Sequence, residues 1–291
     1  MKTAPFIKLH IAVILAGFTG IFGKLVGMDA FVLVWYRMLL VSVLLGAWLF
    51  LSGRKRKISG PDLLKLLFIG ALIAFHWVTF YGSIMKSNIS VGVVCFSLCG
   101  FFSALCEPVI LKKRLEIREL MLGMTAAAGV LLIFSFNTRY RLGISLGMIS
   151  ALLASLFTIY NRKYNTIAPA STLLFYEMAA GFIVLTLFIP GYLYLFPAEG
   201  LIPSLRDVWL LLILAVLCTI IPWIFQIQSL QYISAFTVNL TFNLEPVYTL
   251  VLAFVFFHEA RLLDFSFYAG LAVILIAVAV QTLCARRLPV K

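Results

Sequence analysis

Two side chains of opposite charge, Arg37 and Glu177, lie within otherwise apolar stretches of this 291-residue chain. They also occupy matching points of an internal repeat, because Tyr36-Arg37-Met38 recurs as Tyr176-Glu177-Met178. An ionisable group near the centre of a bilayer is costly, so it faces water or a partner. We therefore predict that Arg37 and Glu177 approach each other across a twofold axis or that both face a central cavity. An ion pair that merely holds the two halves together stays open as an alternative.

Two further groups could bind and release a proton. The imidazole of His76 ordinarily titrates near neutral pH, and Glu245 directly precedes Pro246 within an apolar stretch. We predict Glu177, Glu245 and His76 as ion-coupling residues. The alternatives are a histidine held in a structural hydrogen bond, and a Glu245 satisfied by Thr241 or by a freed backbone donor.

Polar residues recur at helical spacing on five of the apolar stretches. Spacings of three, four and seven place residues on one face of a helix. The five stripes are Gly17, Gly20 and Lys24; His76, Thr79 and Ser83; Ser97, Gly100 and Glu107; Thr219, Pro222, Gln226 and Ser229; and Asn239, Asn243 and Pro246. Together they predict a shared polar interior. We expect its substrate-binding residues to be Arg37, His76, Trp77, Glu177, Trp223, Gln226, Asn239 and Asn243.

The elements that position these residues must lie in a membrane. The chain is 63% apolar and only 12% charged, which is about half the charge of an ordinary soluble protein. A helix needs roughly 20 apolar residues to cross the hydrocarbon core, and apolar runs without a period of two favour helices over barrel strands. The sequence predicts an all-α integral membrane protein with ten transmembrane helices, near residues 6–26, 30–51, 62–83, 89–111, 117–136, 143–163, 167–190, 207–229, 234–257 and 264–284.

The ten predicted spans form two copies of one unit. Beyond the segments of Arg37 and Glu177, the matches are Trp77 and Ser83 with Trp223 and Ser229, Ile89-Ser90 with Ile233-Ser234, and Gly123 with Gly270. An odd number of spans per copy inverts the second copy in the membrane, as in many transporters. We predict a first five-helix repeat over residues 1–138 and a second, inverted one over residues 139–291.

Prolines and basic residues add detail to this scheme. Pro108, Pro222 and Pro246 are predicted to bend their helices, because proline frees a backbone carbonyl group. Most of the 23 Lys and Arg residues fall on the side of the amino terminus, as the positive-inside rule requires of cytoplasmic loops. We therefore predict both termini in the cytoplasm and the chain in the inner (plasma) membrane, with no nucleic-acid partner. Lys24 is expected near the outer mouth, where it attracts anions or reaches the lipid headgroups.

Several other classes of protein are disfavoured by missing motifs. The five cysteines fall inside or at the end of predicted spans and are interpreted as packing residues. No Cys or His spacing indicates a metal site, and no cofactor is predicted. The chain has no G-x-S-x-G elbow and no zinc-protease motif. An integral-membrane enzyme acting on a lipid-soluble substrate remains the alternative function, and the oligomeric state is left open.

The chain resembles the drug/metabolite transporter superfamily, specifically its EamA-type members with two five-helix repeats. The resemblance covers essentially the whole chain and is strongest at Ile233-Ser234-Ala235, Glu245-Pro246-Val247, Glu259, Arg261 and Gly270. Arg37 and Glu177 are similar to charged residues that members carry in the second spans of the two halves. The first repeat departs from the pattern, because Gly100 stands where the proline is expected and Lys113-Arg114 replace the acidic turn.

This resemblance implies a function. It indicates a ten-helix carrier for a small-molecule substrate, most simply an exporter of amino acids or related small metabolites. The mechanism that it implies is alternating access, in which the two halves rock about a site near the midplane of the bilayer.

Overall fold

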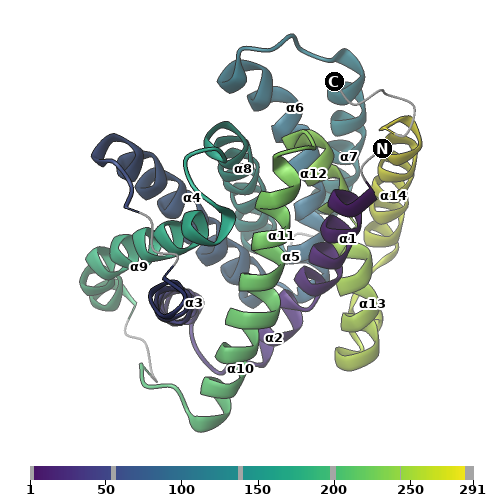
Figure 1. Ribbon diagram of the computed structural model, residues 1–291. Helices are drawn as coiled ribbons and strands as arrows, with labels where there is room; N and C mark the ends of the chain where they lie inside the picture. The colour runs from purple at the N-terminus through teal and green to yellow at the C-terminus, as the bar shows by residue number, and fades with distance from the viewer. Residues whose placement is uncertain (1–2, 54–56, 137–139, 197–200, 243, 286–291) are drawn as a thin grey trace.

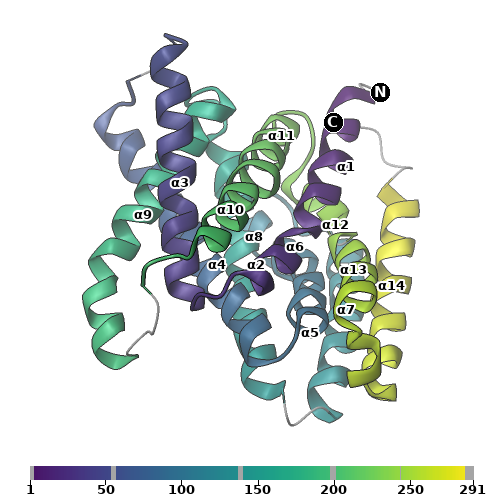
Figure 2. The same cartoon turned by 90° about the horizontal axis from the view of Figure 1, so that it is seen from below.

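The computed structural model describes residues 3–53, 57–136, 140–196, 201–242 and 244–285, and the regular structure of these residues is helical (Figures 1 and 2). Within them, seven helical stretches are long and apolar enough to cross a membrane: Ala4–Leu25, Ala30–Leu51, Gly60–Lys86, Ile89–Leu111, Arg141–Tyr164, Ala170–Leu195 and Leu205–Leu230. The prediction of a helical membrane protein is thereby confirmed.

The helices follow the predicted spans closely. The amino-terminal half contains α1 (Thr3–Gly17), α2 (Thr19–Leu25), α3 (Ala30–Leu51), α4 (Gly60–Lys86), α5 (Ile89–Val94), the 3₁₀ turn η1 (Cys95–Ser97), α6 (Leu98–Leu111) and α7 (Ile117–Phe136). The carboxyl-terminal half contains α8 (Arg141–Tyr164), α9 (Ala170–Leu195), α10 (Leu205–Ala215), the π-helical turn η3 (Val216–Ile220), α11 (Ile221–Leu230), α12 (Ala235–Phe242), α13 (Glu245–Phe257), the 3₁₀ turn η4 (Glu259–Leu262) and α14 (Phe265–Ala285).

Three predicted spans coincide with helices outside the group of seven. They correspond to α7, to α12 with α13, and to α14. The number of ten spans therefore stays a prediction.

Short polar residues set where several helices begin. The carboxylate of Asp29 accepts a hydrogen bond from the backbone N–H of Phe31 at the start of α3, and Asn88 caps α5 in the same way through Val91. At α10, Ser204 and Asp207 form a reciprocal capping box. Such caps satisfy N–H groups that have no partner within the helix. They fix the ends of the helices that surround the site.

Four of the predicted spans are interrupted near their middle. Two of the breaks separate α1 from α2 and α12 from α13. At the other two, the 3₁₀ turn η1 lies between α5 and α6, and the π turn η3 lies between α10 and α11. Backbone groups freed in this way need other partners within a membrane. At the first break the hydroxyl of Thr249 donates to the carbonyl oxygen of Gly17 at 2.8 Å.

The prolines lie near only two of these breaks. Pro222 is in the first turn of α11 and Pro246 is in the first turn of α13. Pro108 lies inside α6, and the interruption of that span is at η1 instead. The interruption of the fourth predicted span therefore lies in a segment that contains no proline.

Helices from the two halves pack in matching pairs. The second, fourth and fifth predicted spans of the first half each contact their counterparts in the second: α3 packs on α9, α5 on α13 with α6 on α12, and α7 on α14. At the last pair a Cβ on Gly270 would lie 2.5 Å from the carbonyl oxygen of Gly129. Only glycine permits so close an approach of two backbones. In Figures 1 and 2 the start of α1 and the end of α14 lie at the same end of the molecule.

Candidate functional site

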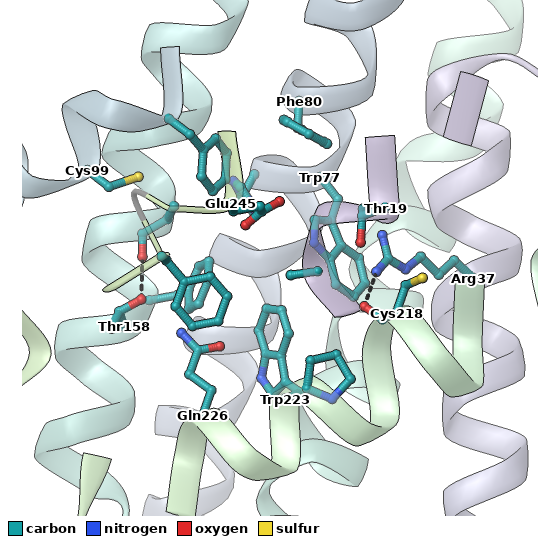
Figure 3. Close-up of a pocket in the computed structure, with 17 residues that line it drawn as sticks. Thr19, Arg37, Trp77, Phe80, Cys99, Thr158, Cys218, Trp223, Gln226 and Glu245 are labelled. Atoms are coloured by element: carbon teal, nitrogen blue, oxygen red, sulfur yellow. Dashed lines mark hydrogen bonds between the residues drawn. The ribbon is translucent and has the colours of Figure 1, made fainter. Parts of the chain in front are cut away.

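The interrupted helices meet around one cavity of about 60 Å³ (Figure 3). Each break contributes lining residues, namely Ala16 and Thr19 at the first, Phe96 at η1, Cys218 at the π turn, and Phe242 and Glu245 at the last. The volume has room for a few water molecules. A larger molecule could enter only if the surrounding helices moved apart.

Arg37 lies in the wall of this cavity and is only 1% exposed. Its guanidinium donates from Nε to the hydroxyl of Thr219 at 2.8 Å, from Nη1 to the hydroxyl of Tyr81 at 2.7 Å, and from Nη2 to the carbonyl oxygen of Cys218 at 3.0 Å. Two of these acceptors, Thr219 and Cys218, lie on the π turn η3, and π turns often occur at functional sites. The charge is thus held rigidly by α4 and by the π turn.

Two tryptophans separate Arg37 from Glu177. The guanidinium carbon of Arg37 lies 3.9 Å from the ring centre of Trp77, which is within the range of a cation–π contact. The rings of Trp77 and Trp223, the residues matched by the repeat, are 5.4 Å apart and meet edge to face. Trp223 in turn faces Glu177. The ion pair considered for Arg37 and Glu177 is not among those of the described residues.

Glu177 is fully buried behind the cavity and does not line it. The side chains of Asn161 and Trp223 approach its carboxyl group, yet both carboxyl oxygens and the indole nitrogen of Trp223 have no hydrogen-bond partner of ordinary geometry. Unsatisfied buried polar atoms of this kind are rare and commonly mark a functional group.

Glu245 faces the cavity directly. It is 6% exposed, and Figure 3 shows its carboxyl group directed into the central space. With the side chains that the structure describes it forms no hydrogen bond, and the cation that acts on it is Arg37. The cavity therefore contains a buried carboxyl group with oxygen atoms available to a ligand.

His76 also lines the cavity, but its imidazole is bound to a neighbouring helix. Its Nδ1 lies 3.0 Å from the carbonyl oxygen and 2.9 Å from the hydroxyl of Ser150 on α8. The ring packs against Phe80, Phe96 and Phe157. On the same stripe, Ser83 donates to the carbonyl oxygen of Gly143. This face of α4 thus packs against α8, and the neighbouring Trp77 and Phe80 line the cavity as well.

The structure gathers five of the eight predicted substrate-binding residues at the cavity, namely Arg37, His76, Trp77, Trp223 and Gln226. Glu177 lies behind Trp223. Asn239 is part of α12, but its side chain, like the whole of Asn243, lies outside the described residues. Of the predicted ion-coupling residues, His76 and Glu245 line the cavity and Glu177 does not.

Other lining residues were missed by the sequence reasoning. They include Thr19, Cys99, Thr158 and Cys218, and the aromatic residues Phe80, Phe96 and Phe157. Cys99 and Cys218 had been interpreted only as packing residues. Four of the missed residues share a position near a helix break, because Thr19, Phe96 and Cys218 lie at breaks and Cys99 follows η1. Chemically, the site offers one fixed guanidinium, one carboxyl group and an aromatic wall.

The comparisons with known proteins cover most of the chain. The model of the EamA-like transporter family matches the chain twice, over residues 6–135 and 141–283. An uncharacterized transporter of Bacillus subtilis (strain 168), YxxF, is 24% identical over 264 residues, which are 88% of this chain and 82% of that protein. An uncharacterized transporter of Archaeoglobus fulgidus is 27% identical over 246 residues, or 80% of this chain and 81% of the relative.

A solved structure shares the fold. One protein crystal structure, 17% identical in sequence, matches with a TM-score of 0.71 over 99% of this chain and 100% of the other. At that level of identity the likeness establishes the architecture alone.

Proposed function

The chain belongs to the EamA-like transporter family, and from this membership we propose that it moves an amino acid or a related small metabolite across the membrane by alternating access. The observation that carries the proposal is the cavity at the helix breaks, which presents the guanidinium of Arg37 and the carboxyl group of Glu245 within an aromatic wall. Discontinuous helices around a central site are typical of transporters.

Arg37 is proposed to hold a substrate carboxylate. Arginine has five N–H donors, and Arg37 uses three of them in the hydrogen bonds recorded among the described residues. The fixed guanidinium leaves donors for an anionic group, and Trp77 and Trp223 offer rings against which the rest of the substrate can pack.

Coupling to protons is proposed at the carboxyl groups. Glu245 faces the cavity, and Glu177 lies directly behind the wall formed by Trp223. A substrate that contacts Trp223 would alter the surroundings of Glu177 and thereby its protonation. His76, bound to Ser150, is the weaker of the three predicted ion-coupling residues.

The two-repeat architecture is proposed to provide the moving parts. Two separate matches to one family model, over residues 6–135 and 141–283, support repeats at 1–138 and 139–291. The pairing of α3 with α9 and of α7 with α14 supports a twofold axis between them. Ten spans would place both termini on one side, and the basic residues favour the cytoplasmic side of the plasma membrane. We propose export as the direction.

Reconstitution tests the proposal most directly. Purified protein in liposomes is offered amino acids, nucleosides and small amines, and saturable uptake of one class, above the level of protein-free liposomes, is the expected result. A membrane enzyme would instead alter a compound chemically, so the recovered compounds are analysed by mass spectrometry. Chemical conversion without transport would reverse the proposal.

A further inference from the structure

A buried acidic side chain joins three segments near the Lys24 end of the first predicted span. Glu259, at the start of η4, is 1% exposed and accepts a hydrogen bond at 3.0 Å from Nζ of Lys24, at the end of α2. It also accepts bonds from the backbone N–H groups of Ile89 and Ser90 and, at 2.7 Å, from the hydroxyl of Ser90. We call these residues the Glu259 cluster.

A related set of residues lies at the other end. Glu107, near the end of α6, forms ion pairs with Lys113 at 3.0 Å and with Arg162 at 3.8 Å. Arg162, at the end of α8, also donates to the carbonyl oxygens of Leu230 and Ile233, which precede α12. We call these residues the Glu107 cluster.

The first predicted span shows that the clusters lie on opposite sides of the membrane. The start of α1 is bound to the Leu230 end of α11, because the hydroxyl of Ser229 donates to the carbonyl oxygen of Pro5 at 3.0 Å. The other end of the same membrane-crossing stretch, Ala4–Leu25, carries Lys24. Thr19 lines the cavity between the two ends.

The two clusters correspond when the halves are exchanged. In the Glu259 cluster, Lys24 from the end of the first half's first span binds Glu259 from the end of the second half's fourth span, and Ile89-Ser90 starts the first half's fourth span. In the Glu107 cluster, Arg162 from the end of the second half's first span binds Glu107 from the end of the first half's fourth span, and Ile233-Ser234 starts the second half's fourth span.

The clusters differ in how completely they are made. Glu259 binds Ser90 directly, whereas Glu107 and Ser234 line a cleft of about 240 Å³. The hydroxyl of Ser234 instead faces Thr237 at 2.8 Å and accepts from its backbone N–H. The structure therefore holds one cluster closed and its counterpart partly made.

From this difference we infer that the Glu259 and Glu107 clusters are the two gates of the transporter, closed in alternation. When the Glu259 cluster opens, Glu107 closes on Ser234 as Glu259 closes on Ser90. This inference rests on the proposed alternating access and assigns positioning roles to residues outside the cavity. A carboxylate bound both by a cation and by hydrogen bonds makes a strong yet reversible contact.

Thiol labelling tests the gates without any substrate. The full-length protein keeps Cys218, which lines the cavity, while its other cysteines are replaced by alanine, and a membrane-impermeant maleimide is applied to either face of sealed vesicles. Glu259→Gln should raise the labelling rate from the Lys24 side about tenfold, the effect expected of losing a hydrogen bond to a charged group. Glu107→Gln should raise labelling from the opposite side.

Control variants keep the result decisive. Ser90→Ala removes one hydroxyl from the Glu259 cluster and should act in the same direction as Glu259→Gln. It therefore replaces Glu259→Gln in the test if size-exclusion chromatography shows that the Glu259→Gln protein is not folded. Lys86→Gln removes a charge close to α5 but outside both clusters and should leave labelling unchanged. Unchanged labelling in folded Ser90→Ala and Glu107→Gln proteins, or increases from the same side, would overturn the gates. Transport assays would then still stand as the separate test of function.

Discussion

At the scale of single residues, the site is organised by the two tryptophans that the repeat matches. Trp77 contacts the guanidinium of Arg37 at 3.9 Å, and Trp223 faces Glu177. The aromatic pair separates charges that the sequence had placed at equivalent points. The two groups therefore have different surroundings: Arg37 is fixed by hydrogen bonds, whereas Glu177 is approached by Asn161 and Trp223 without a hydrogen bond of ordinary geometry.

Replacing Arg37 tests its proposed role in binding. Arg37→Ala should lower uptake by about 30-fold or more, because removing one member of a buried charged contact costs roughly 2 to 5 kcal/mol. Arg37→Lys keeps the charge but lacks the planar fork that reaches Thr219, Tyr81 and Cys218 together, so it should restore little activity. Uptake is measured in proteoliposomes with matched protein content. Normal uptake by Arg37→Ala would assign the residue to structure alone.

Glu177 allows a test of proton coupling that is separate from binding. Glu177→Gln keeps the shape of the side chain, so the protein should fold and exchange substrate for substrate, while uptake driven by an imposed pH gradient should be lost. Because Trp77 and Trp223 stand between the charges, adding Glu177→Gln to Arg37→Ala should not rescue uptake. Rescue by the double variant would show that the two charges neutralise each other directly.

The sequence could predict the charged residues of the site and its two tryptophans, but it missed the small residues and the phenylalanines of the wall. Arg37 and Glu245 are conspicuous because charge within an apolar stretch is costly. Thr19 and Cys218 carry no such signal, since their role depends on where a helix breaks. The break near Thr19 is held by a hydroxyl from Thr249, which is remote in the chain.

At the scale of helices, the breaks and the continuous contacts have different roles. The four broken spans line the cavity together with the continuous helices α3, α4 and α8, whereas α7 and α14 pack together and contribute no residue to its lining. Polar stripes that had suggested a shared interior also serve packing, as Ser83 does toward α8. Amphipathic spacing alone does not distinguish a helix that lines water from one that bonds to a neighbour.

The contact of α7 with α14 predicts loss of stability without loss of binding. In Gly270→Ala the new methyl group would lie 2.5 Å from the carbonyl oxygen of Gly129, and overpacking of this kind typically costs about 1 to 3 kcal/mol. The unfolding temperature should therefore fall while the KM for transport stays unchanged. Gly191→Ala is the matched control, because no atom lies within 4 Å of its added carbon. Equal unfolding temperatures for the two variants would contradict the close packing.

At the scale of the whole molecule, hydrophobic run lengths predicted the helices well because the bilayer sets one length for all of them. The internal breaks were only partly predicted, since η1 forms without a proline and Pro108 lies in an uninterrupted helix. The proposed gates depend on pairs remote in sequence, such as Lys24 with Glu259. Patterns within one span do not reveal such pairs.

The proposed orientation predicts which ends of the helices face the cytoplasm. Lys86 at the end of α4 and Lys112 after α6 are both exposed and lie on opposite sides in the ten-span scheme. In a cysteine-free background, Lys86→Cys should react with an impermeant maleimide on intact cells, and Lys112→Cys only after permeabilisation. The reason is that positively charged loops are retained in the cytoplasm, and the basic residues are concentrated on the side of Lys112. The opposite pattern of labelling would reverse the chain in the membrane and assign the closed Glu259 cluster to the cytoplasmic face.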